Sequence, residues 1–452
     1  MAAVAAPVPL RDERLPVLVQ QRSRERAASR RDARWAQFIL RLGFIATGIF
    51  AFEMALQTWQ QGQIGTHREV VALVFADYAA AFAALTAALV PGERVRRAAL
   101  LIPATLLLVL VAWFYVHIMI SFPAYGTDNA VFSHVAAEQL IAGRNPYSIN
   151  DPALIDASVK RFGLPSTFLT NTTDGRPLSE LMSWPAGSVL VLVPPLYFGL
   201  HDVRWVVVAF EIAVLALLWW RASSVLRPLI VLPLAVDPDL FLRFTAGGVM
   251  DFIWVLPVMA TAIALYRRRL GWAALLYGLS AGTKQQAWLL APFLLVWLWH
   301  TSEDLSLRGR AQTIARFVAV SAAGFLALNA PFMLWDFRGW YDGVMLPFNA
   351  QLVPFGSGIS LLTQTGLVDL PKSFYSVATF GVSGVLLLAY WLHFRTLKHA
   401  IWLAPAVIMW FGYRSLQNYY VYWAPVLLIG LIAWWEEEQG HDLLLHEVPR
   451  DA

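Results

Sequence analysis

Long apolar stretches alternate with short polar segments along most of the chain. The clearest stretches are close in length to a helix that crosses a bilayer, which needs about 20 predominantly apolar residues. We therefore expect membrane-spanning helices at Leu42–Thr58, Val70–Val90, Ala98–Ile120, Trp184–Leu200, Val203–Trp220, Val249–Tyr266, Phe317–Trp335, Val377–Phe394 and Tyr420–Trp435. Shorter stretches at Leu270–Ala281, Ala287–Trp299 and Ile401–Tyr413 raise the expected total to about 11 to 13 helices.

The composition agrees with this pattern. Of the 452 residues, 58% are hydrophobic and only 14% are charged, whereas an ordinary soluble domain is about 25% charged. The sequence therefore predicts an all-α fold, a polytopic transmembrane helical bundle. One Pro-interrupted piece, Leu229–Leu240, is too short to cross the membrane twice, so we expect it to be re-entrant or to lie on the surface.

Basic residues indicate the orientation of the chain, because lysine and arginine are enriched in cytoplasmic loops. Six arginines lie between Arg22 and Arg34, and further groups lie at Arg94–Arg97 and Arg267–Arg269. We therefore expect a multi-pass protein of a bacterial plasma membrane with both termini in the cytoplasm. The long polar loop at 121–183 then faces the extracytoplasmic side, where we expect it to carry short surface helices.

Several kinds of chemistry are excluded by the sequence. The chain has no cysteine, which rules out disulfides, thiolate nucleophiles and cysteine-based metal sites. It contains no HExxH, P-loop, GxSxG or dinucleotide-binding motif, and His134 has no partner that the sequence makes visible. We therefore expect no cofactor, and no divalent metal is indicated. The net charge of +4 does not indicate a nucleic-acid partner, because the basic residues lie between apolar stretches.

An acidic residue, Asp128, follows the third predicted span within the segment Tyr125–Asn129. A carboxylate held at the membrane surface under apolar neighbours can act as a general base. The alternative interpretation is structural: Asp128 could cap the helix that follows it, which we expect to include His134–Ile141.

Two cationic residues lie between apolar stretches on the expected outer side. Lys284 could supply positive charge to a phosphate at the lipid boundary, or it could extend to the interface from the end of a helix. Arg414 could bind a phosphate, or it could belong to an ordinary interfacial turn. Amide side chains that could bind sugar hydroxyls follow both residues: Gln285 and Gln286 after Lys284, and Gln417 and Asn418 after Arg414.

Three further acidic residues have simpler interpretations. Asp251 follows Gly247 and Gly248 at the expected start of a helix, where an acidic residue commonly caps the helix. Asp77 and Glu53 lie inside predicted spans, where they could form polar contacts between helices. Neither of these two is assigned a role.

The order of these motifs resembles that of the GT-C glycosyltransferases, and specifically the bacterial polyprenyl-phosphate-mannose-type transferases of glycosyltransferase family 87. The resemblance covers Ala98–Trp435 and rests on Asp128 after a helix, followed by Ala142–Tyr147, Ser183–Pro185, Val193–Leu196, Gly247–Asp251, Gly278–Lys284 and Gln417–Tyr420. Two features depart from the family. Three predicted spans precede Asp128 where such enzymes usually have one, and Trp184-Pro185-Ala186 replaces an aromatic-Pro-Pro motif.

The resemblance implies a GT-C-like catalytic domain at 98–435. A basic cytoplasmic arm at 1–35 and two additional helices at 36–97 would precede it, and an acidic cytoplasmic tail at 436–452 would follow. It also implies that a sugar, mannose or another hexose, passes with inversion from a polyprenyl-phosphate donor to a lipid or glycan acceptor of the cell envelope. Asp128 would be the base, Lys284 and Arg414 would bind the donor phosphate, and substrate would be bound by Glu180, Asp251, Gln285, Gln286, Gln417 and Asn418.

Other classes of function stay open at this point. A lipid or solute transporter or a flippase would place ionisable residues near the middle of the membrane, and Asp77 and Glu53 are the candidates for such a role. A polymerase or ligase of lipid-linked glycans would use an oligosaccharide diphosphate as donor. A structural or assembly protein of the membrane would have a closed outer face without a cavity.

Overall fold

The computed structural model of the protein describes residues 37–38, 41–56, 68–90, 92, 109, 116, 119–120, 124–165, 169–173, 175, 178, 180–223, 226–227 and 244–438. These residues are mostly helical, with two short strands, in agreement with the predicted all-α class. The predicted re-entrant piece Leu229–Leu240 and nearly all of the predicted span Ala98–Ile120 lie outside the described residues.

The chain forms two compact units, Met1–Leu107 and Leu108–Ala452. In the first unit, residues 41–56 are helical, and α2 spans Arg68–Leu89, close to the predicted span Val70–Val90. Small side chains let these helices pack closely: a Cβ atom on Gly48 would lie 2.7 Å from Leu85 Cγ. Asp77 is fully buried in this unit, and neither of its carboxylate oxygens has a hydrogen-bond partner within the described residues.

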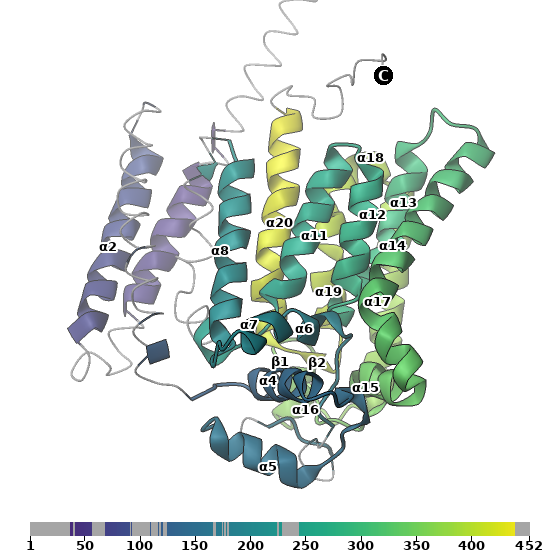
Figure 1. The fold of residues 1–452 in the computed structure, drawn as a ribbon. Coiled ribbons are helices and arrows are strands. Elements are labelled where there is room, and N and C mark those ends of the chain that lie inside the picture. Colours follow the sequence, from purple (N-terminus) through teal and green to yellow (C-terminus); the bar gives the residue numbers. More distant parts are fainter. Residues whose placement is uncertain are drawn as a thin grey trace, which may run out of the picture. The chain divides into compact units, whose positions relative to one another are not determined.

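The second unit contains a bundle of helices that run side by side (Figure 1). The longest are α8 (Arg204–Arg221), α11 (Phe252–Tyr266), α12 (Leu270–Ala281), α13 (Ala291–Thr301), α14 (Leu307–Trp335), α17 (Lys372–Leu392) and α20 (Gln417–Glu438). Each overlaps a predicted apolar stretch. Helix α12 packs against α11 and α14, and α11 also packs against α8 and α20. Large side chains such as Trp254, Trp402 and Trp423 are fully buried between them.

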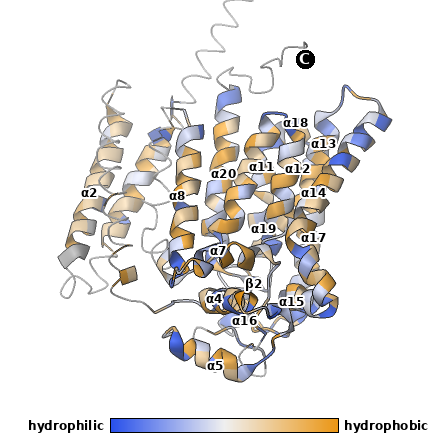
Figure 2. Ribbon diagram, viewed as in Figure 1, coloured by the Kyte–Doolittle hydropathy of each residue, from blue (hydrophilic) through white to orange (hydrophobic). Residues whose placement is uncertain are grey.

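Within the described residues, two helices are long and apolar enough to cross a membrane, α14 and α17. Much of the apolar surface of α17 is exposed, including Val377 and Phe380. Figure 2 shows hydrophobic residues along the middle of the bundle and hydrophilic residues at the top of α20 and at the α13–α14 connection. Length and composition therefore allow a membrane crossing for these two helices, and the complete multi-pass topology stays a prediction.

Short elements cover one end of the bundle (Figure 1). They are α4 (Asp128–Ile141), η2 (Pro146–Ser148), α5 (Pro152–Arg161), α6 (Gly187–Leu190), α7 (Val193–Tyr197), α15 (Phe337–Asn349) and α16 (Ser360–Gln364). The remaining elements join bundle helices: η5 (Gln285–Leu290), α18 (Phe394–Leu397), η6 (Lys398–Trp402) and α19 (Ala404–Trp410). The predicted surface helices in the loop 121–183 correspond to α4, η2 and α5.

Three boundaries differ from the sequence prediction. The predicted span Trp184–Leu200 is two short helices, α6 and α7, because Pro194 and Pro195 lack the N–H groups that a continuous helix needs there. The segment from Asp336 to Tyr375, which contains no predicted span, includes the helices α15 and α16. Helix α14 begins at Leu307 rather than Phe317. Its first turns carry arginines, which lie outside the predicted apolar stretch.

Two strands join segments that are far apart in the sequence. Strand β1 (Phe355–Gly356) pairs in parallel with β2 (Arg414–Ser415). Gly356 has φ +139°, and a Cβ atom on it would lie 2.3 Å from the Ser415 carbonyl oxygen, so only glycine fits this pairing. The segment just before β1 also pairs with the loop at 171–173, through the Thr172–Leu352 bridge. The segment 351–356 therefore holds β2 and the loop 171–173 on either side of itself.

Candidate functional site

Asp128 is the first residue of α4, but it does not cap the helix. Thr127 is the N-cap, and its Oγ1 accepts a hydrogen bond from the Ala130 N–H at 3.2 Å. The Asp128 carboxylate instead turns toward Thr170, whose N–H and hydroxyl both donate to Oδ2, at 3.0 and 2.7 Å. The capping interpretation of Asp128 is therefore wrong, because the residue before it already performs that role.

Arg414 lies on the other side of Thr170. Its Nη2 is 3.5 Å from Thr170 Oγ1, and it forms no ion pair within the described part of the chain. The segment 351–356 brings Asp128 and Arg414 together, because it pairs with the loop 171–173 and with β2. Thr173 N–H donates to the Gln351 carbonyl at 2.7 Å, and β2 starts at Arg414. One hydroxyl group thus separates a carboxylate from a guanidinium group.

A second cluster is buried at the start of α11. Asp251 Oδ1 lies 3.0 Å from Lys284 Nζ, and the exposed fractions of the two side chains are 1% and 7%. Trp254 Nε1 donates to Oδ1 at 3.0 Å, and Asn418 Nδ2 donates to Oδ2 at 2.7 Å. Lys284 Nζ also lies 4.8 Å from the centre of the Trp184 ring. The charge of Lys284 is therefore balanced by a carboxylate rather than free at the surface.

Three glycines bring these clusters near each other. Gly126 N–H donates to the Gly247 carbonyl at 3.1 Å, and a Cβ atom on Gly248, which has φ +86°, would lie 2.5 Å from the Ala130 Cβ. The starts of α4 and α11 are adjacent as a result, and Asn129 Oδ1 accepts from the Met250 N–H at 3.1 Å. The backbone needs glycine here because no side chain fits between the two helix starts.

Tyr419 lies near both clusters. Its phenol lies within electrostatic range of Arg414, Asp251 and Asp128, and it occupies the first turn of α20 beside Asn418. The candidate site therefore comprises Asp128, Thr170, Arg414, Asp251, Lys284, Asn418 and Tyr419. Its residues come from the starts of α4, α11 and α20, from the segments just before η5 and α20, and from the loop between α5 and α6.

The other predicted substrate residues have different surroundings. Gln285 Nε2 donates to the carbonyl oxygens of Ser183 and Val344, both at 2.8 Å, so its amide holds the backbone beside Trp184. Glu180 accepts from Asn150 at 3.5 Å in a short antiparallel bridge. The exposed Gln417 begins α20.

Gln286 has a buried hydrogen-bonding group that stays open within the described residues. Its Oε1 is buried and has no partner within the described residues. A buried carbonyl oxygen without a partner is costly, commonly by about 1 to 3 kcal/mol. Gln286 is therefore a group whose hydrogen bonding a bound molecule could complete.

Asn329 fixes the backbone that carries Lys284. Its Nδ2 donates to the Gly282 carbonyl at 3.1 Å, and its Oδ1 accepts from the Ala186 N–H at 2.9 Å and from Trp340 Nε1 at 3.1 Å. These bonds hold the α12 end against the start of α6. A Cβ atom on Gly187 would lie 2.4 Å from Thr283 Oγ1, so the two segments touch through backbone.

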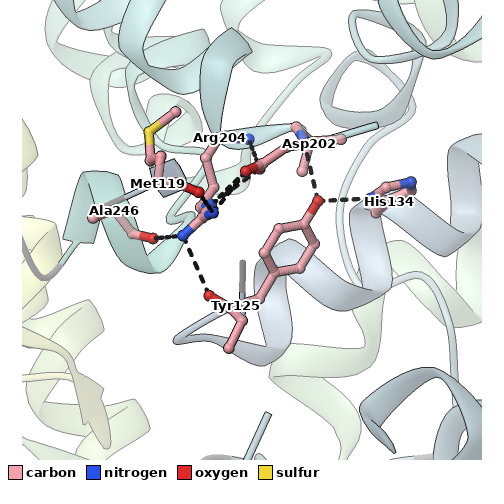
Figure 3. Close-up of polar contacts among 8 residues, drawn as sticks. Met119, Tyr125, His134, Asp202, Arg204 and Ala246 are labelled. Carbon is pink, nitrogen blue, oxygen red and sulfur yellow. Dashed lines mark hydrogen bonds and ion pairs between the residues drawn. The ribbon is translucent and has the colours of Figure 1, made fainter. Parts of the chain in front are cut away.

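A buried arginine supports the α4 side of the site (Figure 3). Arg204 is 1% exposed, and its guanidinium donates to both Asp202 carboxylate oxygens at 2.7 to 3.0 Å. It also donates to the carbonyls of Met119, Ala124 and Ala246 at 3.1 to 3.3 Å. This one side chain joins the start of α8 to the segments before α4 and before α11.

His134 has partners that the sequence does not make visible. The Tyr125 hydroxyl accepts from the Val203 N–H at 3.1 Å, lies 2.7 Å from His134 Nδ1, and can donate to it. On the other side of the ring, Nε2 lies 3.3 Å from Glu138 Oε1. Both ring nitrogens are therefore engaged, which explains why this histidine is buried in α4.

Glu138 is the strongly shifted acid near the site. Burial raises its pKa, but hydrogen bonds from His134 and from Arg161, the latter at 2.7 and 2.8 Å, outweigh burial and lower the pKa to about 2. Glu138 is consequently ionised at neutral pH. It joins α4 to α5 and takes no direct part in the candidate site.

Within the described ranges, no group of three or more histidine, aspartate or glutamate residues is placed to hold a metal ion. The candidate site is instead built from two acids and two cations with neutral donors between them. Sequence reasoning missed Thr170, because a lone threonine in a loop carries no motif. The surrounding sequence, Ser-Thr-Phe-Leu-Thr at 166–170, does not indicate that Thr170 lies beside Asp128.

Comparison with known proteins does not add to this assignment. No family model matches the chain, and neither a curated protein nor a solved structure matches it. The class of protein is accordingly argued from the fold and the site.

Proposed function

We propose that the protein is a membrane glycosyltransferase that transfers mannose or another hexose from a polyprenyl-phosphate donor to a lipid or glycan acceptor of the cell envelope. The observation that carries the proposal is the Asp128–Thr170–Arg414 arrangement. In this arrangement one hydroxyl lies between a carboxylate and a guanidinium group. The guanidinium group forms no ion pair within the described residues. A base and a phosphate-binding cation at this spacing suit transfer from a phosphate leaving group.

Asp128 is the proposed general base. Both of its hydrogen bonds within the described residues are accepted by Oδ2, which leaves Oδ1 to accept the proton of the acceptor hydroxyl. As that proton moves to Asp128, the acceptor oxygen forms a bond to the anomeric carbon. The bond from that carbon to the phosphate oxygen breaks, and its electron pair leaves with the polyprenyl phosphate. Attack from the opposite face gives inversion.

Arg414 is the proposed partner of the departing phosphate. Its planar guanidinium group can form two parallel hydrogen bonds to a phosphate, and electrostatic stabilisation of this kind is worth about 3 kcal/mol for one well-placed donor. Lys284 differs from Arg414 because its charge is already balanced by Asp251. It can bind the donor only if the phosphate replaces Asp251 as its partner.

Sugar recognition is assigned to the residues around this pair. Asp251 and Asn418 present a carboxylate and an amide that are hydrogen-bonded to each other, and Gln286 has a buried amide oxygen without a partner in the described part of the chain. The Gln285 amide is bonded to backbone carbonyls, so we reassign it to positioning. Glu180 and Gln417 stay predicted substrate residues; Glu180 is bonded to Asn150, and Gln417 begins α20.

The membrane is part of the proposed mechanism. Helices α14 and α17 are long and apolar enough to cross a bilayer, and α14 ends at Trp335, next to the layer that contains the site. A lipid-linked donor could then reach the site sideways from the bilayer. We propose that the site faces the extracytoplasmic side, as the distribution of arginines in the sequence predicts.

The proposal is tested by supplying three donors to proteoliposomes that contain the full chain and a mixture of envelope lipids. The donors are a polyprenyl-phosphate hexose, a nucleotide-linked hexose and a polyprenyl-diphosphate oligosaccharide, each radiolabelled in the sugar. We expect transfer from the first donor alone. Transfer from the third donor alone would identify a polymerase or ligase. If labelled lipid only crosses the bilayer and no donor gives a product, the protein is a flippase and the proposal is wrong.

A further inference from the structure

Three consecutive exposed arginines, Arg267–Arg269, form the turn between α11 and α12. The turn lies at the end of the bundle opposite the candidate site. Asp251 and Arg267 flank α11, and the 15 helical residues between them hold the two about 24 Å apart. A function of this turn is therefore independent of the proposed sugar transfer.

Two of these arginines stack on tryptophans from other helices. The Arg267 guanidinium carbon lies 4.9 Å from the ring centre of Trp220 in α8, and that of Arg268 lies 5.6 Å from the ring centre of Trp297 in α13. Arg268 also donates to the Thr301 carbonyl at 2.9 Å. In such a stack the flat face of the guanidinium group packs on the ring. Its N–H groups point outward from the edge and can bind an anion.

Similar pairs recur at this end of the bundle. Arg310 lies 5.5 Å from the ring centre of Trp299, and Arg227 lies 5.6 Å from that of Trp219. Trp220 itself is 57% exposed. Tryptophans beside exposed arginines are typical of the boundary between a bilayer and water, where the ring contacts lipid and the guanidinium contacts headgroups.

The nearby carboxylates neutralise the charge of the turn only in part. Glu436 accepts two hydrogen bonds from Arg221, one of them at 2.7 Å, and Glu437 is bonded to Lys398 and His399. Asp304 lies within electrostatic range of Arg268.

Arg267 is crowded by like charge. Burial, followed by the charges of Arg221 and Arg269, lowers the pKa of Arg267, and Glu436 opposes this only in part. An added anion would relieve this repulsion.

The backbone of the turn is also unusual. Arg268 has φ 55°, the one positive φ at a non-glycine residue in the described ranges. The left-handed region is unfavourable for an ordinary residue, and glycine would adopt it without strain. The Arg268 side chain packs against Trp297, and Arg267 and Arg269 are its neighbours in the turn.

We propose that the Arg267–Arg269 turn and the exposed ring of Trp220 bind the headgroups of anionic phospholipids. Charge complementarity favours this occupant, because juxtamembrane arginines attract anionic lipid by about 1 kcal/mol each. The phosphate accepts hydrogen bonds from the guanidinium edges while the Trp220 ring contacts the acyl boundary. The bound lipid would hold α8 and α11 together at this end of the bundle.

The test uses the purified full chain in a nonionic detergent, with lipid binding followed by native mass spectrometry. Phosphatidylglycerol and phosphatidylcholine are titrated separately. We expect tighter binding of phosphatidylglycerol, and we expect Arg267→Gln and Arg269→Gln each to weaken it about fivefold. Two variants are used because either change alone could alter the turn. Trp220→Leu should weaken the binding of phosphatidylglycerol as well.

The matched control is Arg338→Gln, which removes one exposed positive charge from α15, beyond the far end of α14. It should leave phosphatidylglycerol binding unchanged. Inorganic phosphate alone should not displace the lipid. The proposal is overturned if the wild-type chain binds both lipids equally, if Arg338→Gln weakens binding as much as the two turn variants, or if free phosphate competes with the lipid.

Discussion

Asp251 and Lys284 form an ion pair of 3.0 Å that is almost completely buried at the start of α11. Their charges compensate each other where water is excluded, and Asn418 completes the hydrogen bonding of the carboxylate. A pair of this kind is costly to break from one side, because the charge that is left behind stays buried. The pair is therefore a structural element of the site as well as a possible binding element.

Removing Lys284 alone should destabilise the protein. Lys284→Met leaves the Asp251 carboxylate buried without its cation, and we expect a loss of about 3 to 5 kcal/mol in the free energy of unfolding. The double variant Lys284→Met/Asp251→Leu should recover most of that loss. Denaturant unfolding of the detergent-solubilised chain measures both. A double variant no more stable than the single one would show that the two charges are not coupled.

Thr170→Val should lower turnover and leave the binding of the donor unchanged. The change removes the hydroxyl that donates to Asp128 Oδ2 at 2.7 Å and keeps the size of the side chain. The loss of one hydrogen bond to a charged group is worth about 1.5 to 3 kcal/mol, or more than tenfold in kcat. Steady-state kinetics separate kcat from the KM for the donor.

Thr170→Ser is the control for that experiment, because it restores the hydroxyl with one methyl group fewer. It should keep most of the wild-type turnover. Equal losses in Thr170→Ser and Thr170→Val would mean that the methyl group and local packing matter, and Thr170 would then not position Asp128.

Acidification should weaken the α4–α5 contact through Glu138. Hydrogen bonds from His134 and Arg161 lower the pKa of Glu138 from the ordinary 4.5 to about 2. A depressed pKa means that the stabilisation is fully present above pH 4.5 and is lost as the pH falls toward 2. Thermal unfolding measured from pH 5 to pH 2, about the two pKa values, should show this loss.

Glu138→Gln should flatten that pH dependence, since the glutamine cannot be protonated. Asp156→Asn, at an exposed position of α5, serves as the control and should keep the wild-type slope. If Glu138→Gln and the wild-type chain lose stability in parallel, another acid is responsible.

Arg204 should tolerate no substitution, lysine included. Its guanidinium bonds Asp202 and three backbone carbonyls, and lysine, with three N–H donors on one nitrogen, cannot reach acceptors on so many sides. We expect Arg204→Lys to lower stability by about 3 kcal/mol, as for other broken buried pairs. Differential scanning fluorimetry in detergent would detect this. A wild-type melting temperature in Arg204→Lys would show that the network is redundant.

Much of the bundle could be predicted from apolar periodicity. The sequence located α12 at its observed bounds and α8 within one residue, because both are uninterrupted apolar runs between basic or polar residues. It failed at Trp184–Leu200, where hydropathy stays high while two adjacent prolines interrupt the helix. It also missed the first turns of α14, because arginines such as Arg308 lower the apolar signal without disfavouring helix.

The charged residues of the candidate site could be singled out from the sequence, but its geometry could not. Charged residues beside apolar stretches stand out, so the positions of Asp128, Lys284 and Arg414 along the chain made them candidates. Their partners depend on tertiary pairing: the neutral Thr170 joins Asp128 to Arg414 through a loop held by the segment 351–356. The Asp251–Lys284 pair joins residues of two helices and has no local signature.

The central claim concerns Asp128 as the base. The most direct measurement is single-turnover transfer from a radiolabelled polyprenyl-phosphate hexose by the purified full chain in proteoliposomes, compared between wild type, Asp128→Asn and the control Asp369→Asn at an exposed position. The account predicts transfer with inverted anomeric configuration by the wild type and by Asp369→Asn. It predicts a loss of at least about a hundredfold in Asp128→Asn, with an unchanged melting temperature. Wild-type turnover by a folded Asp128→Asn protein would contradict the account.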